Sequence, residues 1–424
     1  MQLKGSIFYK FGAIFATFVA MPIMIKYLGV EQFGVWSTML TLVNWVMLFD
    51  LGIGNGLKNK ILEGLAKNEG KEVVSYISTA YVLIGLVSFV FFAFFAFASF
   101  HISWREVFNS ASMSEGELRY SVIILSFFVF FNFWMSLVNQ VYHGLQMSSF
   151  VALGQFLSNG LALLFVALLY RFCGASLIKM VLVYGSALVI SNGALSFFIF
   201  KSNAEVRPSI AGFDTRKISP LLSLGGKFFV IQISMLLIFM TDKIIITQLL
   251  GPKQVTPYDV VFKLFSVFTI FHSLILLPIW SAYSNAYAQG DFVWIRDALK
   301  KQIKIAFFIF LGAGFMAFIG PFIVRVWVGK NLEVSNSLYL FFWGFVGVSV
   351  WSNVFAYFVN AVNEINLQIV TSVVAAIINV PMSIYFVSYL GLGLGGVVLA
   401  TTLSLSIFGL VGPVQVLNII RHRL

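Results

Sequence analysis

The chain contains few charged residues, one cysteine and four histidines, and each shortage excludes a class of protein. Only 10% of its 424 residues are charged, against about 25% in a soluble domain, so the composition excludes a soluble globule. The single cysteine, Cys173, cannot form an intramolecular disulfide, and no CxxC or HExxH spacing indicates a zinc site or a metalloprotease. We therefore expect no metal site and no cofactor.

The sequence also lacks a polar segment long enough for an aqueous catalytic domain. No Ser-His-Asp set and no carboxylate pair with acid–base spacing is present, so catalysis is not expected. An integral-membrane glycan polymerase or ligase is kept only as a lesser alternative. It would need a cluster of arginines outside the membrane, and the outer connection at 101–119 holds only Arg105 and Arg119.

Apolar sequence is what the chain has in abundance, since 60% of its residues are hydrophobic and 48 are phenylalanine. A transmembrane helix needs ~20 apolar residues, so this length accommodates about twelve spans and little else. The predicted fold class is an all-α integral membrane protein with about twelve transmembrane helices. The apolar runs lie at about 6–28, 34–55, 74–100, 120–141, 148–170, 176–200, 222–250, 258–282, 303–327, 337–360, 366–388 and 392–417.

The basic residues predict how the chain is oriented in the membrane. The first apolar run starts close to Met1 and lacks a small-residue cleavage site, so we expect it to be retained as the first helix. With a cytoplasmic amino terminus, about seventeen of the 27 Lys and Arg residues fall on the inner side, as the positive-inside rule requires. Both termini are therefore expected in the cytoplasm. The net charge of +11 is then a topology signal, and nucleic acid is not an expected partner.

The two halves of the sequence resemble each other. Gly5 opens a run that ends in YLGVEQFG, and Gly226 opens one that ends in QLLGPKQV, about 220 residues later. Six plus six spans at this offset indicate duplication of a parallel repeat. The sequence therefore predicts an N-lobe at 1–210 with helices one to six, a C-lobe at 211–424 with helices seven to twelve, and a central cavity between them.

Charged residues inside apolar runs are the first candidates for a functional site. One such charge costs ~2.5 to 3.5 kcal/mol at the bilayer centre and usually faces the protein interior or a watery cavity. Asp242 and Lys243 both lie in the run at 222–250, and Lys263 lies at the corresponding depth in the next run. We predict that Asp242 and Lys263 come within salt-bridge distance. A fixed ion pair and a role in coupling or substrate binding are both open for this pair.

Two further acids are candidates for ion coupling. Asp50 precedes the glycine-rich segment DLGIGNGLKNK, and Glu364 lies between the runs at 337–360 and 366–388. The three glycines do not form a nucleotide loop, because the segment follows a membrane helix and lacks the GK[ST] ending. Asp50 either caps this helix end or acts as a protonatable switch.

Four basic and aromatic residues complete the candidate set. Lys26 and Arg325 lie toward the outer ends of their helices, where they either reach the lipid headgroups or bind a phosphate. Trp280 and Trp351 fall within the bilayer rather than at its borders, where tryptophan usually collects. They either pack in the core or stack on a sugar.

Particular strings of the sequence identify a family resemblance that covers nearly the whole chain. YLGVEQFGVWSTMLTLVNWVMLFDLGIGNGLKNKI resembles the amino-terminal signature of the polysaccharide biosynthesis branch of the MOP flippase superfamily. DKIIITQLLG, VTPYDVVFKLFSV and LPIWSAYSNAYAQGDFVWI are similar to segments of Wzx O-antigen flippases. Asp50, Lys26, Asp242, Lys243 and Lys263 fall in or beside these strings, and the resemblance implicates such charges in the cavity without fixing their individual roles.

The resemblance implies a function in lipopolysaccharide biosynthesis. Such proteins move an undecaprenyl-diphosphate-linked oligosaccharide from the inner to the outer leaflet of the bacterial inner membrane, by alternating access coupled to an ion gradient. An O-antigen polymerase and a chain-length regulator are the further partners that this implies. A multidrug and toxin extrusion exporter is the leading alternative.

Overall fold

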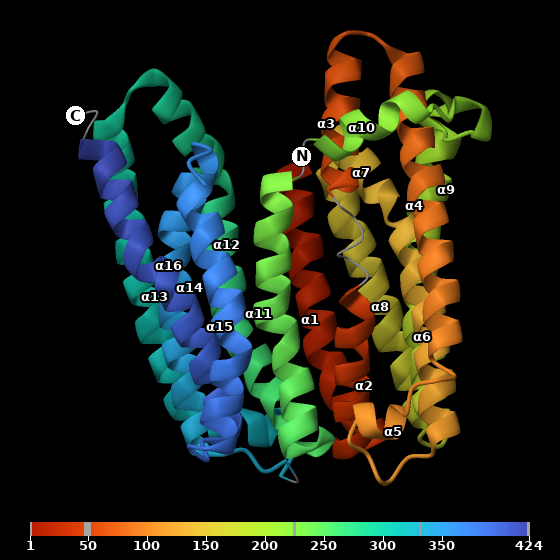
Figure 1. Cartoon of the computed structure of the whole chain (residues 1–424), viewed down its shortest axis with the longest axis vertical. Coiled ribbons are helices and arrows are strands. Elements are labelled where there is room, and N and C mark those ends of the chain that lie inside the picture. Colours follow the sequence, from red (N-terminus) through yellow and green to blue (C-terminus); the bar gives the residue numbers. More distant parts are fainter. Residues whose placement is uncertain (1, 46–51, 224–225, 331, 422–424) are drawn as a thin grey trace. The chain divides into compact units, whose positions relative to one another are not determined.

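The computed structural model describes residues 2–45, 52–223, 226–330 and 332–421. These residues form helices and connecting turns, without a strand among them, and they divide into two compact units at 1–229 and 230–424 (Figure 1). Each unit has its own packed interior. The expected all-α architecture is confirmed.

In the first unit, nine α-helices precede residue 204 among the described residues. The helix pairs α1 and α8, α6 and α9, and α8 and α9 make its main packing contacts. Serine caps fix two of the helix starts, because Ser114 accepts a hydrogen bond from the Glu117 amide and Ser176 accepts one from the Lys179 amide. The helices are α1 (Gln2–Leu28), α2 (Val30–Asn44), α3 (Ile53–Ala66), α4 (Gly70–Ala98), α5 (Trp104–Val107), α6 (Glu115–Met135), α7 (Leu137–Gly144), α8 (Ser148–Phe172) and α9 (Leu177–Ser202).

The structure differs from the sequence prediction in the run at 34–55. Helix α2 ends at Asn44, and the chain is helical again from Ile53 as α3. Gly52, with φ of 80°, has the left-handed conformation that glycine adopts readily, and α3 begins directly after it. Helix α3 buries Ile53, Leu57 and Ile61 and is amphipathic rather than apolar throughout. Asp50 lies outside the described residues.

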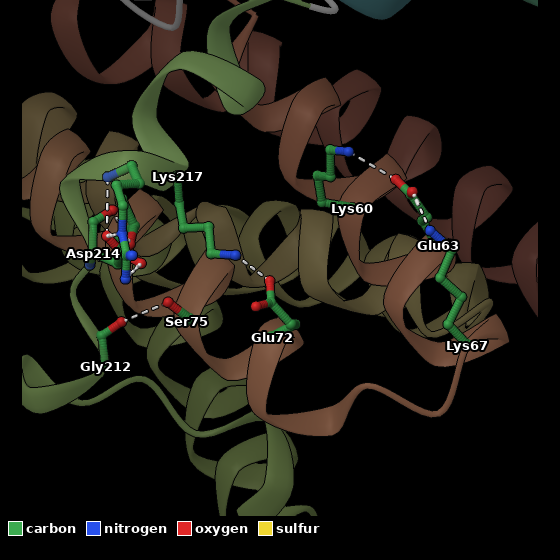
Figure 2. A network of polar contacts seen from close by, with 10 residues as sticks. Lys60, Glu63, Lys67, Glu72, Ser75, Gly212, Asp214 and Lys217 are labelled. Atoms are coloured by element: carbon green, nitrogen blue, oxygen red, sulfur yellow. Dashed lines mark hydrogen bonds and ion pairs between the residues drawn. The ribbon is translucent and has the colours of Figure 1, made fainter.

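A linker segment, residues 204–223, connects α9 to the second unit and packs on α3 and α4. It consists of η2 (Ala204–Val206), η3 (Ile210–Gly212), η4 (Thr215–Lys217) and α10 (Ile218–Ser223). Ser75 of α4 donates a hydrogen bond of 3.0 Å to the Gly212 carbonyl, and Lys217 pairs with Glu72 (Figure 2). These contacts place the linker segment with the first unit.

The second unit contains α11 (Gly226–Leu250), η5 (Pro252–Gln254), α12 (Val255–Gln289), α13 (Phe292–Trp327), α14 (Asn336–Ala361), α15 (Asn366–Ser388) and α16 (Gly393–Arg421). Helix α16 packs along both α14 and α15, and α14 also packs along α12 and α13 (Figure 1). The turn at Gly251, with φ of 86°, returns the chain at once from α11 into η5 and α12.

The pattern of exposure fits a protein surrounded by lipid. Large apolar side chains project outward in the helices, with Phe318 85% exposed and Phe89 70% exposed, while many serine and threonine side chains are buried. Lipid tails are as apolar as these side chains, so a bilayer, unlike water, does not drive them inward. Eleven helices among the described residues are long and apolar enough to cross a membrane. With the shorter α2, they give the expected multi-pass membrane protein of about twelve spans.

Candidate functional site

Asp242 lies at the meeting point of three helices of the second unit. It is on α11 and only 1% exposed. Its carboxylate accepts a hydrogen bond of 2.8 Å from Tyr258 Oη on α12, and bonds of 3.1 and 3.2 Å from Thr401 Oγ1 on α16. A buried carboxylate is costly unless its oxygens are hydrogen-bonded. The two hydroxyls therefore make this position possible for an acid.

The network continues from Thr401 to α15. Asn379 Nδ2 donates to Thr401 Oγ1 at 3.2 Å and to Ser404 Oγ at 3.4 Å, and the Asn379 side chain is completely buried. Its other side-chain atom, Oδ1, has no hydrogen-bond partner, and neither does the Ser383 hydroxyl one turn further along α15. Four helices thus share one buried polar network, which we call the Asp242 network: Asp242, Tyr258, Asn379, Thr401 and Ser404.

An ion pair lies beside the Asp242 network. Lys243 Nζ is 2.7 Å from Asp259 Oδ1, and these side chains are 23% and 9% exposed. Asp259 and Lys243 are also charged neighbours of Lys263, which lies one turn beyond Asp259 on α12. Two acids and two lysines therefore occupy adjoining turns of α11 and α12, and their formal charges balance. This balance is what allows four charges to lie together inside a membrane bundle.

The ion pair that the structure shows between α11 and α12 joins Lys243 and Asp259, whereas the sequence predicts Asp242 with Lys263. The prediction assumed a loop centred near Lys253, but the chain turns at Gly251 and enters η5 directly. Asp242 is consequently level with Tyr258, about one helical turn before Lys263. The ion pair between the two helices is instead made by Lys243 and Asp259.

The remaining predicted site residues lie at helix ends, in a turn and on the side of α14. Lys26 and Arg325 are exposed in the last turns of α1 and α13. Glu364 is exposed in the turn between α14 and α15, where its carbonyl accepts a hydrogen bond of 2.8 Å from Gln415. Trp351 is 39% exposed on α14, and its indole donates to the Gly409 carbonyl at 2.7 Å. None of these contacts brings them to the Asp242 network.

A cavity of about 480 Å³ lies within the second unit, among α11, α12, α14, α15 and α16. Ser404, an end member of the Asp242 network, also lines this cavity. Tyr357 lines it as well, and its ring makes an edge-to-face contact with the predicted Trp280, with 5.6 Å between the ring centroids. The second unit therefore combines a buried acid with an adjoining cavity.

The sequence reasoning missed Asp259, Tyr258, Asn379 and Thr401. Asp259 had a usable signal, because it is an acid within an apolar run and four residues before Lys263. Asn379 and Thr401 are uncharged polar residues, which are frequent in membrane helices, so only their contacts with Asp242 single them out.

Comparison with known proteins connects this architecture to transport. A protein of Yersinia pseudotuberculosis named for O-antigen export is 22% identical over 83% of this chain and 81% of its own length. A protein of Salmonella typhi named as an O-antigen transporter is 23% identical over 88% of this chain and 86% of its own length. A multidrug resistance MATE family transporter of the MOP superfamily, solved in an inward-facing conformation, has the same fold, with a TM-score of 0.78 at 16% identity over 96% of this chain and 94% of its own.

The family assignment rests on most of the sequence. Residues 3–284, from α1 through nearly all of α12, match the family described as polysaccharide biosynthesis protein. The match includes Asp242 and Asp259 of the second unit as well as the whole first unit. This chain belongs to the polysaccharide biosynthesis protein family.

Proposed function

We propose that this protein is a flippase that moves undecaprenyl-diphosphate-linked O-antigen or related oligosaccharide units from the inner to the outer leaflet. The observation that carries the proposal is the Asp242 network, a polar network buried within apolar helices. Such a network is expensive in a membrane bundle and is typical of transport pathways. The names of the O-antigen relatives, which align over more than four fifths of this chain, support the substrate class.

The physical task defines what the protein must supply. A diphosphate and a hydroxyl-rich glycan cannot cross ~30 Å of hydrocarbon unaided, whereas the apolar polyprenyl tail is soluble in it. The protein needs polar surface that is open first to one side of the membrane and then to the other. We propose that the two lobes, drawn at 1–210 and 211–424 from the sequence, provide this by alternating access.

Asp242 is the residue that we propose for proton coupling. Both of its oxygens accept hydrogen bonds from hydroxyls that belong to other helices. Adding a proton would turn one acceptor into a donor, so Tyr258 or Thr401 would have to rotate. Protonation would therefore change the contacts between α11, α12 and α16. Asp50 and Glu364 are the other coupling candidates, and the exposure of Glu364 at a helix turn supports it less well.

For the substrate itself, we propose that lysine and arginine bind the diphosphate and tryptophan contacts sugars. Lys243 is held by Asp259, so its charge becomes available to a phosphate only when that ion pair opens. The exposed ends of Lys26 and Arg325 are accessible without such a change. The full proposed set is Lys26, Lys243, Lys263 and Arg325 for the diphosphate, and Trp280 and Trp351 for the glycan.

We further propose that the protein resides in the bacterial inner membrane with both termini in the cytoplasm, and that an O-antigen polymerase and a chain-length regulator act with it. The excess of Lys and Arg on the segments assigned to the inside supports the orientation. The partners follow from the substrate, because a transported unit must next be polymerised.

Deletion of the gene tests the proposed function. Lipid-linked oligosaccharide units should accumulate on the inner leaflet, and a plasmid copy should clear them. The multidrug exporter is the second candidate, favoured by the TM-score of 0.78 to a MATE transporter. It predicts no accumulation, together with increased sensitivity of the deletion strain to cationic drugs. That result would overturn the flippase proposal.

A further inference from the structure

The cavity of the second unit is lined by uncharged side chains, none of which has a role in the transport mechanism proposed above. Its described lining contains no Asp, Glu, Lys, Arg or His, although the chain has 27 Lys and Arg residues. Apolar and aromatic side chains form most of the wall, and serine, threonine, asparagine and glutamine supply the polar atoms. An anionic group such as a diphosphate would find no counter-charge here, so any occupant that fits is uncharged.

Three residues that line this wall carry buried polar atoms without a hydrogen-bond partner. The atoms are Ser349 Oγ, Asn360 Oδ1 and Gln368 Oε1. The Ser349 and Gln368 side chains are only 7% and 6% exposed. A buried polar group without a partner costs ~1 to 3 kcal/mol, and most such groups in folded proteins are satisfied. Two of the three are amide oxygens, which only accept, so these atoms favour an occupant that donates hydrogen bonds.

The cavity extends from the turn between α14 and α15 toward the middle of the helices. Asn360 lies in the last turn of α14 and Gln368 in the first turn of α15, next to the turn that the topology places on the cytoplasmic side. Ser349 and Ser404 lie about three turns deeper in α14 and in the middle of α16. Its volume of about 480 Å³ falls within the ~300 to 1,000 Å³ of small-molecule sites.

We propose that this cavity is a subsite for uncharged sugar residues of the transported glycan, which enter from the cytoplasmic end of the second unit. Sugar hydroxyls donate to Ser349, Asn360 and Gln368, and Tyr357 offers an aromatic face or edge. Carboxylate-bearing sugars are excluded, because no cation lines the space. The diphosphate stays outside it. The proposal rests on the flippase function and names where part of its substrate binds.

The subsite also adjoins the acid that we propose for coupling. Ser404 lines the cavity and accepts from Asn379, which in turn donates to Thr401, a hydrogen-bond donor to Asp242. A sugar hydroxyl that bonds to Ser404 therefore shares a hydroxyl group that already accepts from Asn379. Sugar occupancy and the hydrogen bonding of Asp242 are linked through this single chain of contacts.

Binding measurements on the full chain in lipid nanodiscs test the subsite. The probes are the lipid-linked oligosaccharide extracted from the deletion strain and bare undecaprenyl diphosphate. Ser349→Ala and Gln368→Leu should each weaken binding of the glycan-bearing lipid about three- to tenfold, the range for one lost hydrogen bond. Binding of the bare lipid should be unchanged. Ser372→Ala is the matched control, because the Ser372 hydroxyl lines the same cavity but already donates to the Ile369 carbonyl at 3.0 Å.

Thermal unfolding separates a ligand site from a packing defect. Removing an unpartnered buried polar atom should leave the Tm of the empty protein unchanged or raise it. Ala356→Leu, which fills the cavity, should likewise keep or raise the Tm while weakening glycan binding about tenfold.

Two results would overturn the subsite, and they are distinct from failure of the flippase function. If the glycan-bearing lipid binds the wild type and all three variants equally, the cavity does not hold sugar while the flippase proposal stands. If the variants weaken the bare lipid as much as the glycan-bearing one, the cavity holds part of the lipid instead. If no lipid-linked oligosaccharide accumulates in the deletion strain, the transport function itself is contradicted.

Discussion

At the scale of single residues, the buried carboxylate of Asp242 is the most constrained group in the second unit. Three helices converge on it, and each donor that reaches it would be left unsatisfied if the side chain were removed. The neighbouring ion pair of Lys243 and Asp259 is similar, because removing either charge takes away a counter-charge that lies 2.7 Å from the other.

Truncating Asp242 should therefore be more damaging than neutralising it. We expect Asp242→Ala to lower the free energy of unfolding by ~2 to 5 kcal/mol, because Tyr258 and Thr401 each lose an acceptor. Asp242→Asn keeps one acceptor oxygen and the side-chain volume, so it should lose less than half as much. Thermal unfolding of the purified chain measures both. Equal destabilisation by the two variants would show that the hydroxyls do not depend on this side chain.

The ion pair can be tested by a double-mutant cycle. Lys243→Met and Asp259→Leu should each destabilise the protein, by up to ~3 to 5 kcal/mol, because each removes a close counter-charge from a largely buried ion pair. The double variant should recover most of this loss. Additive losses in the double variant would mean that the two side chains do not depend on each other.

The exposed end of α3 offers a pH-dependent group outside the membrane. The pKa of Glu63 lies at about 2, below its usual 4.5, because the side chain of Lys60 donates to its carboxylate, as does that of Lys67 (Figure 2). Because the folded pKa is depressed, the stabilisation is present above the ordinary pKa and is lost as pH falls toward about 2.

We expect Lys60→Gln to raise the pKa of Glu63 more than Lys67→Gln does, since the bond from Lys60 is the larger influence. Titration of the Glu63 carboxyl carbon by NMR gives both values. A titration midpoint near 4.5 in the wild-type protein would contradict the claim that Lys60 and Lys67 lower the pKa of Glu63.

At the scale of elements, the positions of the helices were predictable and their contacts were not. Apolar runs predicted the membrane helices because the length of each hydrophobic segment can be read directly from the sequence. The run at 34–55 was mistaken for one helix, since Gly52 within it has a left-handed backbone that composition does not reveal. The pairing of Asp242 was missed for a related reason, because the register of α11 against α12 depends on a turn at Gly251 only a few residues long.

The linker segment is the element whose packing is most easily tested. A Cβ atom at Gly56 of α3 would lie 2.2 Å from the backbone oxygen of Leu221 on α10, closer than any real contact. Gly56→Ala should therefore detach α10 from α3 and make residues 204–223 more susceptible to limited proteolysis. Gly70→Ala, at the start of α4 with open space around it, is the matched control. Identical cleavage of both variants would contradict the observed packing.

At the scale of the whole molecule, the orientation in the membrane remains a prediction. Cys173, the only cysteine of the chain, is exposed in the turn between α8 and α9, which the proposed topology places outside. A membrane-impermeant maleimide should label it in intact spheroplasts. In a Cys173→Ser background, a cysteine at Lys71 should be labelled only after permeabilisation. The reverse pattern would invert the topology.

The family of this chain could be recognised from its sequence, because the matching strings run along most of its length, and the match over 3–284 confirms it. The cavity of the second unit could not be foreseen. It is formed by side chains of five helices whose spacing depends on packing, and none of its polar residues stands out in composition.

Reconstitution into liposomes tests the central claim most directly. The wild-type chain should move lipid-linked oligosaccharide from one leaflet to the other, as followed by its accessibility to a glycosidase outside the vesicle, while Asp242→Asn should fold and bind the lipid but transport it at least about tenfold more slowly. Transport by the variant at the wild-type rate would contradict the role of Asp242. Absence of transport by the wild-type protein, with the substrate bound, would contradict the flippase itself.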